Sequence, residues 1–185
     1  MVSPEAFADE LDLKLTAYPY DIKNQPLAYN SMVLDLVSIL TDETVILARA
    51  KEKKIFLSEE DVALAESEFK KDYPQDSFEQ MLLENAIPYP VWRNRLEKDM
   101  VIDKIVQLEL VDVQEISPED MVAFYSRIAG QPEDERHALD EAGLVKQLRM
   151  EKSQAFYDEW ISGLKIKYPV EINQKALAVF LMKQE

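Results

Sequence analysis

Large apolar side chains recur every three or four residues along most of the chain, which is the spacing of one face of an α-helix. From Ser3 to about Tyr18 the repeat is formed by Phe7, Leu11 and Leu15. The longest repeat runs from about Asn30 to Lys54. Its apolar stripe contains Val33, Leu36, Val37, Leu40 and Leu47. A helix of that length, about 36 Å, is expected to be buried at its centre.

One six-residue pattern occurs three times, as VSPEAF at 2–7, LSEEDV at 57–62 and ISPEDM at 116–121. In each copy a serine follows an apolar residue, and a serine at the N-cap accepts hydrogen bonds from the free backbone N–H groups of a first helical turn. Asp61 and Asp120 stand three residues after their serines and form a variant of the capping box. The pattern therefore predicts three helix starts.

Similar spacings predict further helices over about 58–73, 76–87, 90–113, 117–130 and 137–165. We expect Asp76 to cap the second of these helices and Gly130 to end the fourth. In KYPVEIN at 167–173 the residues Tyr168, Val170 and Ile172 alternate with others, which predicts a short strand. The expected fold is a single all-α domain over 1–185, built from several helices with at most that short strand.

Composition narrows the classes of function. The chain of 185 residues has 36 acidic and 21 basic side chains, a net charge of -15, which disfavours nucleic acid and anionic lipid as partners. It has no cysteine, which excludes disulfides and thiolate chemistry. No apolar run approaches the ~20 residues of a membrane span, and no signal-like segment precedes Ser3. We expect any targeting segment to have been removed from the chain.

The residues give no basis for an enzyme. His137 is the single histidine, and an exposed position at a helix start accounts for it. A di-iron bundle usually needs two Glu-x-x-His pairs, but the nearest match is one Asp134-Glu135-Arg136-His137. Neither a G-x-S-x-G elbow nor a phosphate-binding loop is present. We therefore expect no catalytic residue, no metal site, no cofactor and no small-molecule substrate.

The order of the segments resembles the N-terminal chaperone module of SurA-type periplasmic folding factors. The segments that carry the resemblance are LDLVSILTDETVILARAKEKKIFLSEEDV, FEQMLLENAIPYPVWRNRL, ISPEDMVAFY and KSQAFYDEWISGLKIKYPVEIN. The resemblance implies an ATP-independent holdase for unfolded, outer-membrane polypeptides, periplasmic or lipid-anchored at a membrane. It also implies that the last long helix, with its stripe of Phe156, Trp160 and Leu164, packs back on the early helices.

The chain departs from the family pattern in two respects. Members often insert a parvulin prolyl isomerase domain where this chain has only AGQPEDERHA between Ile128 and Leu139, far below the ~50 residues of a small domain. The chain is thus divided into early helices at 1–130, a loop at 131–137 and a closing part at 138–185, with no isomerase activity expected. Members also usually have a strand before the first helix, and here only Met1 and Val2 precede Ser3.

Tyrosines at or between predicted helix ends are the candidate client-binding residues: Tyr18, Tyr20, Tyr29 and Tyr89. A phenol ring offers apolar area together with a polar hydroxyl, which suits contact with varied polypeptides on exposed loops. The alternative that the residues leave open is a helical scaffold or adaptor with one dedicated protein partner. The oligomeric state is left open as well.

Overall fold

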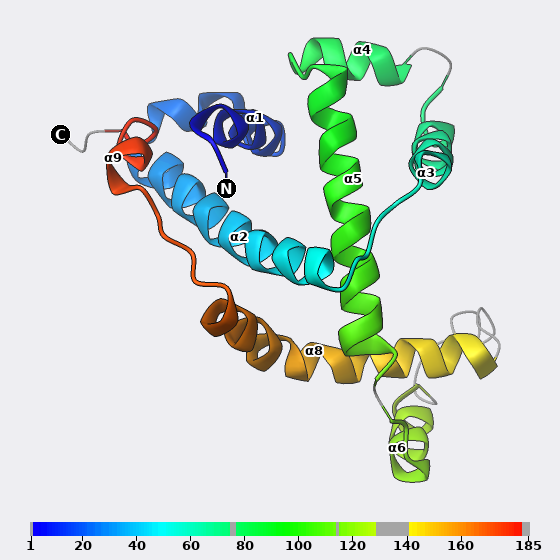
Figure 1. The fold of residues 1–185 in the computed structure, drawn as a ribbon. Helices are drawn as coiled ribbons and strands as arrows, with labels where there is room; N and C mark the ends of the chain where they lie inside the picture. Colours follow the sequence, from blue (N-terminus) through cyan, green and yellow to red (C-terminus); the bar gives the residue numbers. More distant parts are fainter. Residues whose placement is uncertain (1, 75–76, 114, 129–140, 183–185) are drawn as a thin grey trace. The chain divides into compact units, whose positions relative to one another are not determined.

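The computed structural model describes residues 2–74, 77–113, 115–128 and 141–182, apart from the side chains of 141 and 142. Eight α-helices lie in these ranges, together with a short 3-10 helix and a π-helical turn, and the predicted all-α class is confirmed (Figure 1). The elements are α1 (Pro4–Leu15), η1 (Tyr20–Asn24), α2 (Pro26–Glu52), α3 (Glu59–Lys71), α4 (Ser77–Glu84), α5 (Tyr89–Val106), η2 (Gln107–Val111), α6 (Pro118–Ile128), α8 (Glu141–Lys167) and α9 (Gln174–Leu177).

The three predicted serine caps are confirmed. Ser3 Oγ accepts from the backbone N–H of Ala6 at 3.2 Å, before α1. Ser58 and Asp61 bond reciprocally at 3.1 and 3.0 Å and form a full capping box before α3. Before α6, Ser117 and Asp120 make the same pair of bonds, at 3.1 and 2.9 Å. The expected roles of Asp76 and Gly130 fall outside the described residues.

The predicted strand at Tyr168–Ile172 is wrong, since the residues after α8 run without regular secondary structure to the N-cap of α9 at Asn173. A strand needs a neighbour to pair its N–H and C=O groups, and the described residues contain no other strand. Without a partner strand the alternating apolar residues are not covered, and Val170 and Ile172 are 38% and 44% exposed.

The chain divides into two compact units. The sequence predicted a single domain and did not indicate this division. Unit 1 comprises Met1–Ile102 and Leu164–Glu185, and unit 2 comprises Asp103–Gly163. The buried apolar side chains of unit 2 are Ile105, Leu110, Val111, Phe124, Leu148 and Ile161. None of the helices in the described ranges combines the length and the apolar content needed to cross a membrane.

Among the residues that the structure describes, hydrophobic clusters of unit 1 include the following. The first joins α1, η1 and α2 through Leu11, Ile22, Tyr29, Met32, Val33, Leu36 and Leu40, and we call these residues the α1/α2 cluster. Leu177, Phe180, Leu181 and Met182 pack against it, so the late part of unit 1 does return to the early helices. The second cluster joins α4 and α5 through Phe78, Leu82, Ile87 and Trp92.

The stripe expected on the last long helix is only partly buried. Leu164 is 6% exposed and belongs to unit 1, as expected of a closing residue. Phe156 is 47% exposed, which corrects its expected burial. Apolar residues such as Met150, Ile161 and Ile166 are spread around α8 rather than confined to one stripe, and a helix can bury only the face that meets a partner.

Candidate functional site

Two of the four candidate tyrosines lie on the surface between helices, as predicted. Tyr18 follows α1 and is 36% exposed, and Tyr20 begins η1 and is fully exposed. The backbone N–H of Tyr18 bonds to the carbonyl of Leu15 at 3.0 Å, which keeps this link tight against the end of α1. Both phenol rings are therefore presented on a short, ordered connection.

Tyr29 does not lie on a loop, because α2 begins at Pro26 and carries it in its first turns. Its side chain is 6% exposed and belongs to the α1/α2 cluster. Burial, together with the negative charge of Asp12, raises the pKa of the Tyr29 hydroxyl. The expectation of an exposed loop tyrosine is wrong at this position, since a proline at the first helical position extends the helix earlier than the apolar repeat indicated.

Tyr89 is the first residue of α5 and is 41% exposed. Its hydroxyl donates a hydrogen bond to Glu66 Oε2 at 2.7 Å, and that bond raises the pKa of Tyr89. Lys70 Nζ lies 5.5 Å from the centre of the ring, within the range of a cation–π contact. Tyr89 is thus held in place by α3, with part of its ring still open to solvent.

Tyr89 belongs to a group of five aromatic residues from α3, the residues just after it, α4 and α5. Trp92 is central: its ring lies 5.3 Å from Phe69, 4.7 Å from Phe78 and 5.9 Å from Tyr89. Phe69 stacks on Tyr73 at 5.5 Å. Phe78 and Trp92 are buried, whereas Phe69 is 39% exposed and Tyr73 is partly exposed. We call Phe69, Tyr73 and Tyr89 the aromatic surface.

Neither Phe69 nor Tyr73 was among the candidate residues predicted from the sequence. A usable signal was present, because both aromatic residues lie close to the end of α3 and just before Pro74, the same setting that selected the other tyrosines. The structure does not bring the four predicted tyrosines together, since Tyr29 and Tyr89 belong to different clusters.

Charged side chains border the aromatic surface and are paired. Lys70 Nζ lies 2.8 Å from Glu66 Oε1, and Arg93 Nη2 lies 2.7 Å from Glu59 Oε2. Burial opposes the ionisation of Glu66, but the hydrogen bonds from Lys70 and Tyr89 leave the pKa of this carboxyl below its usual value. Apolar rings beside paired charges form an amphipathic surface.

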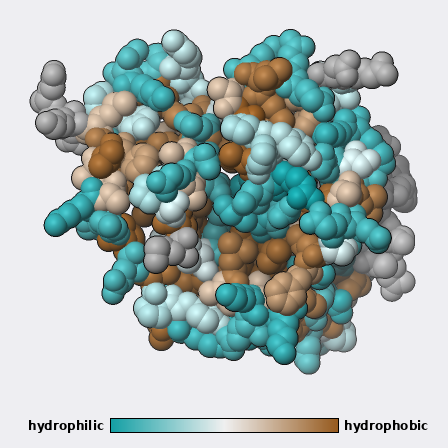
Figure 2. Space-filling model, turned by 45° about the horizontal axis from the view of Figure 1, so that its top comes forward, coloured by the Kyte–Doolittle hydropathy of each residue, from teal (hydrophilic) through white to brown (hydrophobic). Residues whose placement is uncertain are grey.

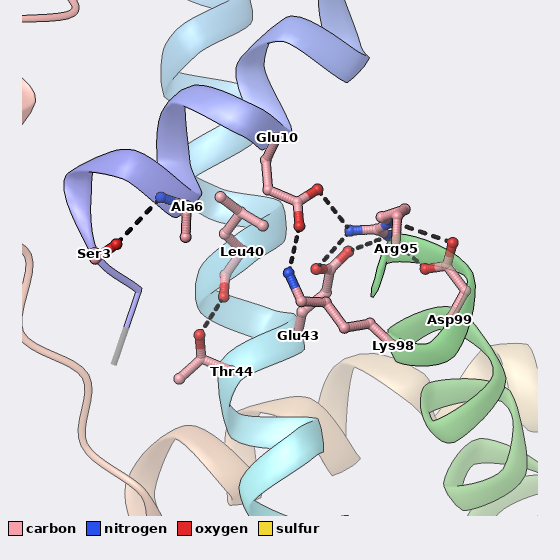
Figure 3. A network of polar contacts seen from close by, with 9 residues as sticks. All are labelled: Ser3, Ala6, Glu10, Leu40, Glu43, Thr44, Arg95, Lys98 and Asp99. Carbon is pink, nitrogen blue, oxygen red and sulfur yellow. Dashed lines mark hydrogen bonds and ion pairs between the residues drawn. The ribbon is translucent and has the colours of Figure 1, made fainter. Parts of the chain in front are cut away.

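A network of ion pairs fixes α5 against α1 and α2 (Figure 3). Arg95 donates to both carboxylate oxygens of Glu43, at 2.9 and 2.6 Å, and to Glu10 at 3.3 Å. Lys98 donates to the other oxygen of Glu10 at 2.6 Å. Burial opposes the charge of Arg95, yet Glu43 and Asp99 hold its pKa above the usual range. The network positions α5, which carries Trp92 and Tyr89.

Unit 2 also presents apolar side chains to solvent. The exposed ones are Leu108, Val113, Val122, Tyr125, Met150 and Phe156, at 43% to 66% exposure. Val122 and Tyr125 are three residues apart on α6 and share one side of that helix. Figure 2 shows one face of the molecule, on which hydrophobic residues reach the surface among hydrophilic ones.

No group of three or more His, Asp or Glu side chains suited to a metal ion occurs in the part of the chain that the structure describes. The chain matched no protein-family model, no curated protein and no solved structure.

Proposed function

We propose that this protein is an ATP-independent holdase that binds unfolded or extended polypeptides and keeps them from aggregating. The observation that carries the proposal is the exposure of large apolar side chains in both units. Exposed aromatic residues are Tyr18, Tyr20, Phe56, Phe69 and Tyr89 in unit 1, and Tyr125 and Phe156 in unit 2.

Exposed apolar side chains suit clients whose sequences are unrelated to one another. An unfolded chain offers apolar groups at varied spacings, so a binder with several separate apolar contacts gains more than one with a single shaped pocket. Tyr89 and Tyr18 add a hydroxyl to an apolar ring, which tolerates polar client groups beside apolar ones. The net charge of -15 keeps such a protein soluble despite its exposed apolar side chains.

The periplasm, or a lipid anchor at a membrane, is the proposed location, and outer-membrane polypeptides are the proposed clients. Both parts rest on the resemblance of the segment order to SurA-type factors. The absence of cysteine is compatible with an oxidising compartment. No isomerase activity is proposed, because the chain has too few residues between Ile128 and Leu139 for a parvulin domain.

The proposal is tested by light scattering from an unfolded outer-membrane protein diluted out of denaturant, with and without excess of this chain. We expect ATP-independent suppression of scattering, with micromolar affinity, on the order of -8 kcal/mol. Apolar contacts should persist when salt rises from 0.1 M to 1 M, whereas ionic capture would weaken as the screening length falls from ~10 Å to ~3 Å.

Two controls sharpen that experiment. A proline-limited refolding assay should show no acceleration over the uncatalysed rate, which is tens to hundreds of seconds at 25 °C. The double variant Phe69→Ser/Tyr89→Ser should suppress aggregation less than Glu68→Ser, a substitution of an exposed charged neighbour on α3. If scattering is unaffected by excess protein while one folded protein binds saturably, the adaptor interpretation replaces the holdase.

A further inference from the structure

The residues that follow α8 return to α1 and α2 and pack on them as a short segment (Figure 1). We call residues 173–182 the return segment. It contains the four-residue helix α9, capped by Asn173 Oδ1 on the N–H of Ala176 at 3.1 Å, and turns beyond it. It is joined to α8 by residues without regular secondary structure.

Asn30 on α2 holds the main chain of this segment. Its Nδ2 donates to the carbonyl oxygen of Met182 at 2.9 Å, and its Oδ1 accepts from the backbone N–H of Met182 at 2.8 Å. One side-chain amide therefore satisfies both main-chain groups of one residue. Because every residue except proline carries the same N–H and C=O, this contact does not depend on which side chain stands at that position.

The side chains of the return segment that contact α1 and α2 do so through apolar packing. Leu177, Phe180, Leu181 and Met182 are partly buried against the α1/α2 cluster. The ring of Phe180 meets that of Phe7 edge-on, with centroids 4.8 Å apart. Val179, in the middle of the same stretch, is 81% exposed. The segment is thus anchored by a few large apolar groups and one main-chain contact, with an unused position between them.

We propose that the face of α1 and α2 under the return segment is a binding site for short peptides with large apolar side chains, and that the chain's own return segment occupies it and competes with them. The proposal rests on the holdase function and names one of its sites. Its recognition chemistry is an amide at Asn30 that pairs with a peptide main chain, beside an apolar bed that takes aromatic and aliphatic anchors.

The contacts of the return segment are suited to reversible release. Its anchors are partly buried rather than enclosed, and its one helix has a single turn. Segments with few buried contacts open at far lower free energy than the whole fold, so a minor population with the site vacant is expected. An incoming peptide binds only that population. Its apparent affinity is therefore the intrinsic affinity multiplied by the fraction of molecules that are open.

The experiment measures binding of a fluorescent, acetylated peptide with the sequence of residues 173–182 to the full-length chain. A second peptide has unrelated polar positions and three consecutive large apolar residues. Phe180→Ala weakens the internal competitor, and we expect it to raise the apparent affinity for both peptides at least about tenfold over the unsubstituted chain. Val179→Ala is the matched control, because Val179 is exposed on the same segment, and it should leave the affinity unchanged.

Asn30→Ala added to Phe180→Ala should remove most of the gained affinity for both peptides. Equal affinity of the unsubstituted chain and a folded Phe180→Ala variant would overturn the proposal, and so would binding of the chain's own peptide alone. If Phe180→Ala does not fold, hydrogen exchange on the unsubstituted chain decides. Added peptide at millimolar concentration should accelerate exchange of the Met182 amide severalfold, and an unchanged rate rejects the competition.

Failure of this inference is distinguishable from failure of the holdase function. Suppression of aggregation with no effect of Phe180→Ala on peptide affinity would leave the holdase standing and reject this site. Competition for peptide without suppression of aggregation would establish the site and reject the holdase.

Discussion

At the scale of single residues, two helices end at a residue that adopts the left-handed backbone conformation although it has a Cβ. Lys54 and Ala86 have positive φ angles of 58° and 53°. After each, an amide N–H reaches back into the helix: Ile55 bonds to Ala50 at 2.9 Å, and Ile87 bonds to Leu82 at 2.9 Å. This is the Schellman arrangement, in which glycine is the usual residue because it lacks a Cβ.

Replacing either residue by glycine should therefore stabilise the protein. We expect Lys54→Gly and Ala86→Gly each to raise the free energy of unfolding by about 0.5–1 kcal/mol, measured by urea denaturation. The matched control is Ala63→Gly, at an exposed position inside α3, which should lower it by about 1 kcal/mol. A loss of stability at residues 54 and 86 would contradict the left-handed caps.

Asp120 carries a pH dependence that can be assigned to one pair. The hydrogen bond from Lys152 Nζ at 2.7 Å, with the bonds of Asp120 to Ser117, lowers the pKa of this carboxyl to about 2. A pKa lowered by folding stabilises the protein above the unfolded value, near 4, and that contribution is lost as pH falls toward about 2. The stability difference between the unsubstituted chain and Asp120→Asn should thus shrink over that range.

An NMR titration of the Asp120 carboxyl checks the cause directly. In Lys152→Ala its pKa should move back toward the ordinary value of an aspartate, because the largest interaction that lowers it is gone. Titration of Asp120 in the ordinary range in the unsubstituted chain would reject the pairing with Lys152.

Residue-scale features were predictable where a short pattern carries its own chemistry. Ser3, Ser58 and Ser117 cap helices because a hydroxyl bonds to N–H groups three residues away, so the relevant atoms are adjacent in sequence. The left-handed ends at Lys54 and Ala86 were not predictable, because neither residue prefers that conformation and the bonds of the helix end impose it.

At the scale of elements, the Arg95 network determines how firmly α5 is held. Arg95→Ala would leave Glu43, whose side chain is 12% exposed, without its bidentate partner, and would weaken the fixation of Glu10. We expect a loss of about 2–4 kcal/mol in the free energy of unfolding, since a largely buried carboxylate without a partner is costly. The measurement is urea denaturation at neutral pH.

The control for this substitution is Lys71→Ala. Lys71 pairs with Glu68 on the same helix, and both side chains are more than half exposed, so at most about 0.5 kcal/mol should be lost. In a double-mutant cycle, Glu43→Gln should cost much less once Arg95 is already alanine. Strictly additive costs would show that the two residues do not interact.

Helix positions were predicted from spacing, but the partners of each helix were not. The stripe of α2 correctly indicated Val33, Leu36 and Leu40 as buried, because a long amphipathic helix buries one face whatever covers it. The aromatic surface was not predicted as a unit, since Phe69 and Tyr89 are brought together around the buried ring of Trp92 only by the packing of α3 on α5. The main-chain contact of Asn30 joins residues 152 positions apart, and no local pattern indicates it.

At the scale of the whole molecule, each unit contains one tryptophan, Trp92 in unit 1 and Trp160 in unit 2. Trp92 is 9% exposed and enclosed by aromatic rings, whereas Trp160 is partly exposed and donates to Glu109 at 3.2 Å. Unit 2 is the smaller, and smaller units bury a lower fraction of their surface. We expect Trp160 fluorescence to change at a lower urea concentration than Trp92 fluorescence.

The variants Trp92→Phe and Trp160→Phe isolate the two signals, and far-ultraviolet circular dichroism of each gives the unfolding of the helices as a whole. Coincidence of all transitions in both variants would mean that the two units unfold as one cooperative body.

The boundary between the units falls within helices, at Ile102 in α5 and at Gly163 in α8. A protease needs several residues of extended chain in its cleft, and an intact helix does not supply them. Limited digestion, the common way to map domain boundaries, would therefore leave this one uncut. Early cleavage should fall instead on connections such as Ile55–Leu57, and the resulting fragments would divide unit 1 rather than separate it from unit 2.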